Sequence, residues 1–216
     1  MGYKTLFLFG PESACVFALL QRGLCYEIAI LVIDHDSGFV VVHRAFLAVG
    51  VDIDACGLVT LSMHGKKVVP KDVEALKELK ASTKLPFIVK GIMTVEDAML
   101  AVEAGVDAIV VSNHGGRVLD CTPGAADVLP AIAEAVKGKV TILADGGVRS
   151  GVDVLKMIGL GADGVLIGRP FVTASFGGAK EGVKLYVDKL IDELEATMRL
   201  TGCQSVKDID GKVIFR

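Results

Sequence analysis

Short apolar runs that end in polar residues recur along the chain from about residue 45. The clearest run, at 108–112, passes abruptly into the glycine-rich turn Asn113–Arg117. Unbroken apolar runs of this length are typical of strands buried on both faces of a parallel sheet. The same pattern predicts four further strands, at 47–52, 86–91, 141–144 and 164–167.

Helical periodicity fills the intervals between these strands. In the first interval, Val73, Leu76 and Leu79 recur at helical spacing. Two other helices have start signals, because Thr94 and Ser150 are each followed three residues later by an aspartate. The predicted helices cover 70–82, the segment from Thr94 to Gly105, about 123–136, the segment after Ser150, and about 178–200.

Five strand–helix units in succession indicate an α/β protein with a parallel sheet. The segments 105–109 and 161–165 are near copies, and each joins a helix to the next strand. A (β/α)8 TIM barrel and a doubly wound sheet both fit this repetition, but no GxGxxG fingerprint follows an early strand. We therefore predict a TIM barrel that is incomplete at its N-terminus, with five clear βα units.

Residues 1–44 do not continue this pattern. The local interpretation is a β-hairpin, with strands at Ile28–Ile33 and Phe39–Val42 around the turn Asp34–Gly38. The apolar stretch Leu6–Leu20 is interrupted at Pro11–Ser13, so neither a signal peptide nor a membrane span is expected. We predict a divergent N-terminal segment at 1–44 and a barrel portion at 45–216.

Composition narrows the class of protein. A hydrophobic content of 52% with only 6% aromatic residues fits strands that are covered on both faces. The net charge of −3 provides no basic surface for nucleic acid. The five cysteines are scattered and form no CxxC pair, which favours reduced thiols in the cytoplasm over a disulfide framework or a zinc site.

Polar residues at the strand ends are the candidate catalytic groups, because the carboxyl ends of barrel strands meet at one mouth. Lys90 ends an apolar strand, so its ammonium needs an anion or an electron-rich ligand nearby. His114 could pair with Asp52 and act as a general base, and Arg117 could hold a carboxylate in bidentate fashion. The alternatives are a structural histidine and a βα turn with incidental polar residues.

The last two strands suggest a phosphate site, since barrel enzymes often bind phosphate on these loops. Glycines there free backbone N–H groups, and arginines supply charge. The candidate residues are Gly146, Gly147, Arg149, Gly168 and Arg169. The alternative is a pair of surface arginines beside turns.

Several motifs together resemble the FMN-dependent α-hydroxy acid oxidases and dehydrogenases, the family of glycolate oxidase, lactate oxidase and mandelate dehydrogenase. The motifs occur in the family's order over about residues 45–210. They are Val89-Lys90-Gly91, Ser112-Asn113-His114-Gly115-Gly116-Arg117-Val118-Leu119-Asp120, Asp145-Gly146-Gly147-Val148-Arg149-Ser150-Gly151, Ile167-Gly168-Arg169-Pro170 and Leu200-Thr201-Gly202-Cys203.

The resemblance implies FMN as the cofactor and oxidation of a small 2-hydroxy acid to the 2-oxo acid as the reaction. It implies that His114 is the base, that Asp52 orients it and that Arg117 binds the substrate carboxylate. It also implies that Lys90 stabilises the anionic reduced flavin. The remaining implied contacts to FMN come from Ser112, Asp145, Gly146, Gly147, Arg149, Gly168 and Arg169. The electron acceptor (oxygen, a quinone or another) stays open, as does the choice between carbanion and hydride routes.

The chain also departs from the family. Residues 1–44 contain no flavin-contacting Pro-Thr-Ala loop, Gln-x-Tyr strand or substrate-binding tyrosine, and the arginine expected soon after Asp52 is missing. We expect a fragment, a frame-shifted product or a divergent shortened form. Five strands would leave two open sheet edges, which favours a homo-oligomer. The rival functions are another FMN barrel enzyme, similar to type 2 isopentenyl diphosphate isomerase, and a non-catalytic truncated barrel.

Overall fold

The computed structural model of the chain describes residues 6–8, 14–22, 25–33, 40–42, 48–57 and 69–215. The chain divides into two compact units. One unit is residues 47–146, and the other combines residues 1–46 with residues 147–216. Each unit is described below by itself.

A four-stranded parallel sheet forms the centre of the 47–146 unit. Its neighbouring strands follow the order of the sequence: β5 (Val49–Asp52), β6 (Phe87–Ile92), β7 (Ala108–Val111) and β8 (Thr141–Ala144). All four residues of β7 are buried, as expected for an apolar strand in the middle of a parallel sheet. Because the strands are parallel and in sequence order, the polar residues that follow them all lie at the same end of the sheet, where the strands have their carboxyl ends.

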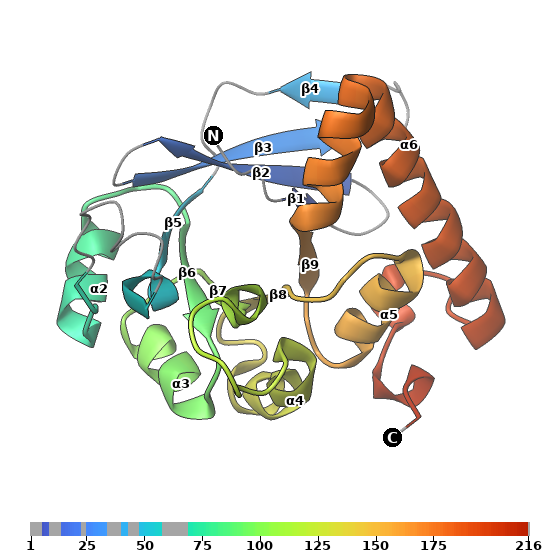
Figure 1. The fold of residues 1–216 in the computed structure, drawn as a ribbon. Coiled ribbons are helices and arrows are strands. Elements are labelled where there is room, and N and C mark those ends of the chain that lie inside the picture. The colour runs from blue at the N-terminus through green and yellow to red at the C-terminus, as the bar shows by residue number, and fades with distance from the viewer. Residues whose placement is uncertain are drawn as a thin grey trace. The chain divides into compact units, whose positions relative to one another are not determined.

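Three helices of this unit, α2 (Val73–Ala81), α3 (Val95–Glu103) and α4 (Ala125–Val136), alternate with the strands. Figure 1 shows them side by side along the sheet, and contacts join α2 to α3 and α3 to α4. Asp72 and Thr94 cap the first two helices, accepting hydrogen bonds from backbone N–H groups three residues later. Leu129 and Ile132 of α4 are fully buried, and α4 contacts β8 of the sheet.

Asp107, just before β7, ties three elements of the unit together. Its carboxylate accepts hydrogen bonds from the Lys80 ammonium of α2 and from the backbone N–H of Phe87, at the start of β6. Burial acts to raise the pKa of Asp107, but these bonds and the Lys80 charge outweigh it and lower the pKa. The near-repeat around 105–109 thus has a structural role in joining a helix to a strand.

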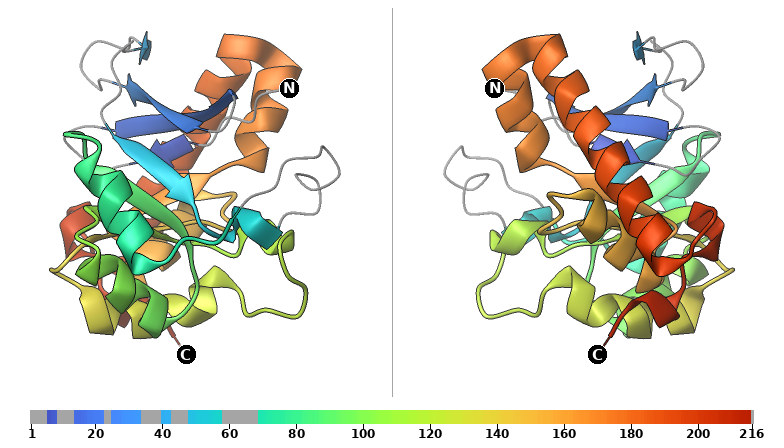
Figure 2. Two further views of the ribbon diagram at one scale, coloured as in Figure 1. Left: turned by 90° about the vertical axis from the view of Figure 1, so that its left-hand side faces the viewer. Right: turned by 90° about the vertical axis from the view of Figure 1, so that its right-hand side faces the viewer.

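The other unit contains β9 (Gly164–Ile167), α5 (Gly151–Gly159), the long helix α6 (Arg169–Thr201) and the short 3-10 helices η3 (Val206–Asp208) and η4 (Gly211–Val213). The backbone of α6 leaves helical geometry at Gly178 and Ala179, which divides it into the two arms visible in Figure 2. The C-terminal arm buries Val187 and Leu190 and packs against α5. The predicted helix at 178–200 is therefore confirmed, but the element begins earlier, at Arg169.

In the described residues before the regular region there are four strands. β3 (Cys25–Ile33) pairs antiparallel with both β2 (Ala14–Arg22) and β4 (Val40–Val42). The two strands of the predicted hairpin are confirmed, and the turn at 34–38 lies outside the described residues. β1 (Leu6–Leu8) pairs antiparallel with β9. This pairing was not predicted, and it covers a strand edge that five strands alone would leave open.

The predicted succession of five strand–helix units is confirmed, since β5 to β9 are each followed by a helix. No helix within the described residues is long and apolar enough to cross a membrane. The strand ends that carry the candidate catalytic residues are the ends of β5, β6, β7 and β8.

The close packing of α5 on α6 gives a test of the fold. A Cβ atom added at Gly151 would lie 2.2 Å from the backbone nitrogen of Leu194 and 2.5 Å from the carbonyl oxygen of Leu190. We predict that Gly151→Ala destabilises the protein by about 1–3 kcal/mol, because backbone must move to admit the methyl group. Urea unfolding followed by circular dichroism measures the change.

The matched control is Gly177→Ala, since a Cβ atom at Gly177 meets nothing within 4 Å. This control should leave stability unchanged or raise it slightly, because alanine favours a helix over glycine. Equal midpoints for the two variants would contradict the packing described here.

Candidate active site

The register of β5 against β6 creates an ion pair at the carboxyl end of the sheet. Asp52 is the direct partner of Lys90 across the two strands, and the Lys90 Nζ atom lies 2.9 Å from Asp52 Oδ1. The two side chains are only 7% and 13% exposed. Asp145, after β8, places its Oδ2 atom 4.0 Å from the same ammonium. The anion expected near Lys90 is therefore present.

Burial and charge act in opposite directions on these groups. Burial raises the pKa of Asp52 above its usual range, against the lowering influence of Lys90 and His114. Burial alone would lower the pKa of Lys90, but the charges of Asp145, Asp52 and Asp54 outweigh it and raise the pKa. Lys90 consequently stays a cation in a site that is nearly closed to solvent.

The loop after β7 holds the histidine through its backbone. The N–H of Ser112 donates to the Ile92 carbonyl, and the N–H of His114 donates to the buried Ser112 hydroxyl at 3.1 Å. His114 has a φ of 56°, a left-handed conformation that is uncommon outside glycine and is often found at functional sites. Asn113 closes the turn by accepting a hydrogen bond from Gly116 N–H.

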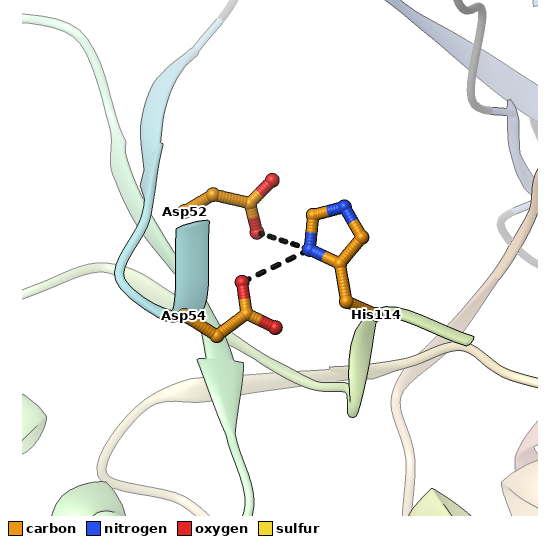
Figure 3. A group of neighbouring side chains, drawn as sticks. All are labelled: Asp52, Asp54 and His114. Carbon is orange, nitrogen blue, oxygen red and sulfur yellow. Dashed lines mark hydrogen bonds and ion pairs between the residues drawn. The ribbon is translucent and has the colours of Figure 1, made fainter. Parts of the chain in front are cut away.

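One nitrogen of the His114 imidazole faces two carboxylates (Figure 3). Its Nδ1 atom lies 3.0 Å from Asp54 Oδ1 and 3.8 Å from Asp52 Oδ1. The expected pairing with Asp52 is present, but Asp54 is the closer partner. Figure 3 shows the other nitrogen, Nε2, on the side of the ring turned away from both carboxylates. A base needs this arrangement, with one nitrogen held and the other free to take a proton.

Sequence reasoning missed Asp54. The residue begins the short 3-10 helix η1 (Asp54–Gly57), which Ile53 alone separates from β5. A second carboxylate two positions past the strand end was the available signal. In an extended strand, residues two apart point to the same side of the sheet. Asp54 lies beyond the strand, however, and the local turn that directs both carboxylates to one imidazole could not be predicted from the sequence.

Arg117 lies three residues beyond His114 on the same loop. Its Nε–H group donates to the His114 carbonyl oxygen at 3.0 Å, and the residue is exposed. This bond anchors the side chain beside the histidine, and no described residue pairs with the two Nη atoms of the guanidinium, which can therefore bind a ligand. A planar fork of this kind suits a carboxylate.

Asp52, Asp54 and His114 also form a set of metal-ligating types, with ligand atoms within 4.8 Å of one another. The Lys90 ammonium, however, already lies against one of the two carboxylates. A divalent cation in the same place would meet this buried positive charge, which disfavours its binding. The arrangement of these three residues therefore suits proton chemistry better than a metal centre.

The predicted phosphate residues belong mostly to the other unit, which holds Gly147, Arg149, Gly168 and Arg169. Asp153 accepts hydrogen bonds from the backbone N–H groups of Arg149 and Ser150, which fixes the start of α5. The Tyr186 hydroxyl donates to the Arg149 carbonyl, and burial together with nearby acidic charges raises the pKa of Tyr186 to about 12. Gly146 belongs to the 47–146 unit together with the catalytic candidates.

The structure therefore brings together Asp52, Lys90, His114 and Asp145 at the carboxyl end of the sheet. The Ser112 hydroxyl and the Arg117 guanidinium are both hydrogen-bonded to the backbone of His114. This group combines a held imidazole, a buried ammonium and a guanidinium. Together they can accept a proton, stabilise negative charge and bind a carboxylate.

The chain is similar to known proteins. A peroxisomal (S)-2-hydroxyacid oxidase of Arabidopsis thaliana is 52% identical over 139 residues, covering 64% of this chain and 38% of that protein. An L-lactate dehydrogenase of Xanthobacter autotrophicus is 39% identical over 214 residues, covering 96% of this chain and 53% of that protein. A crystal structure of a mandelate oxidase variant matches with a TM-score of 0.69 and 37% identity, over 78% of this chain and 54% of that one.

The chain spans between 38% and 53% of the length of the two relatives named above. The likeness to mandelate oxidase, together with the five strand–helix units, identifies the fold as part of a TIM barrel. The sequence pattern of the FMN-dependent dehydrogenases matches residues 57–216, which include Lys90, His114 and Arg117. The chain belongs to the FMN-dependent dehydrogenase family.

Proposed function

We propose that this protein takes part in the FMN-dependent oxidation of a small 2-hydroxy acid to the 2-oxo acid. The observation that carries the proposal is the His114 imidazole, whose Nδ1 faces Asp54 and Asp52 while Nε2 is turned away from them. Relatives named (S)-2-hydroxyacid oxidase and L-lactate oxidase support the substrate class.

His114 is the base in this proposal. Two carboxylates on Nδ1 favour the tautomer with its proton on that atom, which leaves Nε2 as the proton acceptor. They also stabilise the imidazolium formed when the proton arrives. The proton comes from the substrate carbon or from its hydroxyl, and the arrangement of His114 serves both routes. Asp52 has the second role of orienting Lys90.

Arg117 binds the substrate carboxylate. Its guanidinium is exposed, its Nε–H is held by the His114 carbonyl, and its two Nη atoms provide the fork. Because Arg117 is hydrogen-bonded to the backbone of His114, the orientation of the substrate is linked to the position of the base. Such orientation is a large part of the rate enhancement that enzymes achieve.

The residues present fit FMN. Lys90 stays charged and nearly buried, as needed to stabilise negative charge on a reduced flavin. The Asp145 Oδ1 atom is buried and accepts no hydrogen bond from the described residues, so a hydroxyl or N–H group of a ligand would satisfy it. Ser112 and Gly146 complete the candidate contacts in this unit. When bound, FMN supplies the acceptor for the two electrons that leave the substrate.

In the other unit, Gly147, Arg149, Gly168 and Arg169 are the candidates for the FMN phosphate. Gly147 and Arg149 precede the start of α5, and Gly168 and Arg169 stand at the start of α6. Both arginines are exposed residues, and their positive charge suits a phosphate.

The proposal extends to the cellular compartment, the division of the chain and its assembly. The scattered cysteines favour a reducing compartment such as the cytoplasm, although two relatives are named peroxisomal. The division at residue 44 and assembly as a homo-oligomer are further proposals. The electron acceptor is oxygen, a quinone or another compound.

The direct test of the proposal is a visible spectrum. The purified chain is mixed with FMN, made anaerobic, and treated in turn with lactate, glycolate and mandelate. Loss of the bound flavin's visible absorbance with one of these acids, with formation of the 2-oxo acid, is the expected result. A bound flavin that none of the acids reduces would overturn the proposed function.

Arg117→Lys tests substrate binding. Lysine keeps the positive charge but loses the planar fork, so we predict a higher KM for the 2-hydroxy acid with unchanged FMN binding. Steady-state kinetics and flavin fluorescence measure the two quantities separately. Unchanged kinetics would remove Arg117 from the substrate site.

His114→Ala tests the base. We predict that this change slows flavin reduction by ~10²–10⁴, the factor usual for removal of a general base. Stopped-flow absorbance under anaerobic conditions gives the rate of this step. Reduction at the wild-type rate would assign His114 a structural role only.

The short chain itself leads to a further prediction. The 216 residues match 38% of the length of the Arabidopsis oxidase, so these residues by themselves are expected to make fewer contacts to FMN than a complete barrel would. We predict FMN binding weaker than about 1 μM and a molar mass above that of one chain. Fluorescence quenching and light scattering are the measurements. A monodisperse monomer that binds FMN more tightly than this would show that residues 1–44 complete a working site.

A further inference from the structure

Asp54 occupies a slot that the neighbouring strand leaves open. A Cβ atom at Gly91 would lie 2.8 Å from the Asp54 Cγ atom and 2.9 Å from its Cβ atom, so only glycine admits this carboxylate. The backbone is held as well, because the N–H of Ile53 donates to the Lys90 carbonyl at 2.9 Å. The carboxylate is therefore positioned by β5 and β6 rather than by a free loop.

This placement carries a cost in stability. The side chain of Asp54 is only 14% exposed, and its Oδ2 atom is buried without a hydrogen bond from any described residue. A buried carboxylate oxygen with no donor destabilises the folded state. The other oxygen makes the compensating contact, the 3.0 Å bond to His114 Nδ1. The His114 imidazole is therefore the group on which Asp54 acts.

The charges around the ring support the same conclusion. Among the described residues, the ionisable groups that face His114 or its partners are Asp52, Asp54, Asp145, Lys90 and Arg117. Asp52 is shared with the Lys90 ammonium at 2.9 Å, whereas no ammonium or guanidinium among the described residues pairs with Asp54. Asp54 is thus the carboxylate whose negative charge remains available to a protonated imidazole.

We propose that Asp54 is the principal positioning residue for His114: it fixes the Nδ1–H tautomer and stabilises the imidazolium, while Asp52 mainly serves Lys90. This inference rests on the proposed function for its effect on the reaction. The tautomer itself can be tested without any reaction.

The first experiment uses ¹⁵N NMR of the four histidine rings in the full chain, with the His114 signals identified by their loss in His114→Ala. The wild type should show the Nδ1–H tautomer. Asp54→Asn and Asp54→Ala should shift the ring toward the Nε2–H tautomer by more than Asp52→Asn does. Asp97→Asn is the control, because Asp97 is an exposed residue of α3, and it should leave the ring unchanged.

A ring that keeps its tautomer in both Asp54 variants, or that responds only to Asp52→Asn, would overturn the proposal. Circular dichroism checks that the variants fold. If neither Asp54 variant folds, the tautomer of the wild type is the test. An Nε2–H tautomer in the wild type would overturn the proposal, because Nδ1 would then have no N–H to donate to Asp54.

The second experiment follows the reaction in the FMN-loaded protein. Asp54→Asn should slow flavin reduction about ten- to hundred-fold, the factor expected for loss of one hydrogen bond to a charged group, with KM little changed. The acid limb of the pH–rate profile should move to lower pH, because the neutral imidazole then loses a nearby negative charge that favours protonation.

The two experiments separate the two hypotheses. If the wild type reduces no flavin with any 2-hydroxy acid, the proposed function fails, and the NMR comparison still decides the role of Asp54. If the wild type is active and Asp54→Asn matches it in rate and pH profile, the positioning role is wrong while the proposed function stands.

Discussion

The register between β5 and β6 is the constraint on which the candidate site depends. It sets Asp52 beside Lys90, so that a carboxylate and an ammonium enter a nearly closed space as a pair. Either charge alone would be costly to bury. A slip of one residue between these strands would place the two side chains on opposite faces of the sheet. The helices and caps of the 47–146 unit preserve this register, and with it the electrostatics of the site.

The base depends on the same sheet in a different way. His114 is held by hydrogen bonds that pass from Ile92 through Ser112 to its own backbone, and its ring is held by carboxylates from the end of β5. Three strands thus determine the position of one imidazole. Preorganisation of this kind is what a proton-transfer site requires, because groups that are already in place need not be ordered during the reaction.

Much of this arrangement could be predicted from the sequence. Apolar runs ending in Asp52, Lys90 and Ser112 located the strands, because burial on both faces leaves a strong local signal. The capping residues Thr94 and Ser150 located helix starts for a similar local reason. Asp54 was missed because its role depends on a turn and on the absence of a side chain at Gly91, which is distant in sequence. The pairing of β1 with β9 is likewise non-local and leaves no periodic signal.

The slot over Gly91 bears on how such a site can arise. Gly91 has a φ of 102°, which side chains rarely tolerate, so its glycine is required by the backbone independently of Asp54. The space above it therefore exists before any carboxylate fills it. A single substitution at position 54 could supply a second anion to the base with no preparatory change elsewhere. With Asp54 in place, a side chain gained at position 91 would have to displace it. The backbone geometry that requires glycine at position 91 therefore also keeps open the space in which the second carboxylate lies.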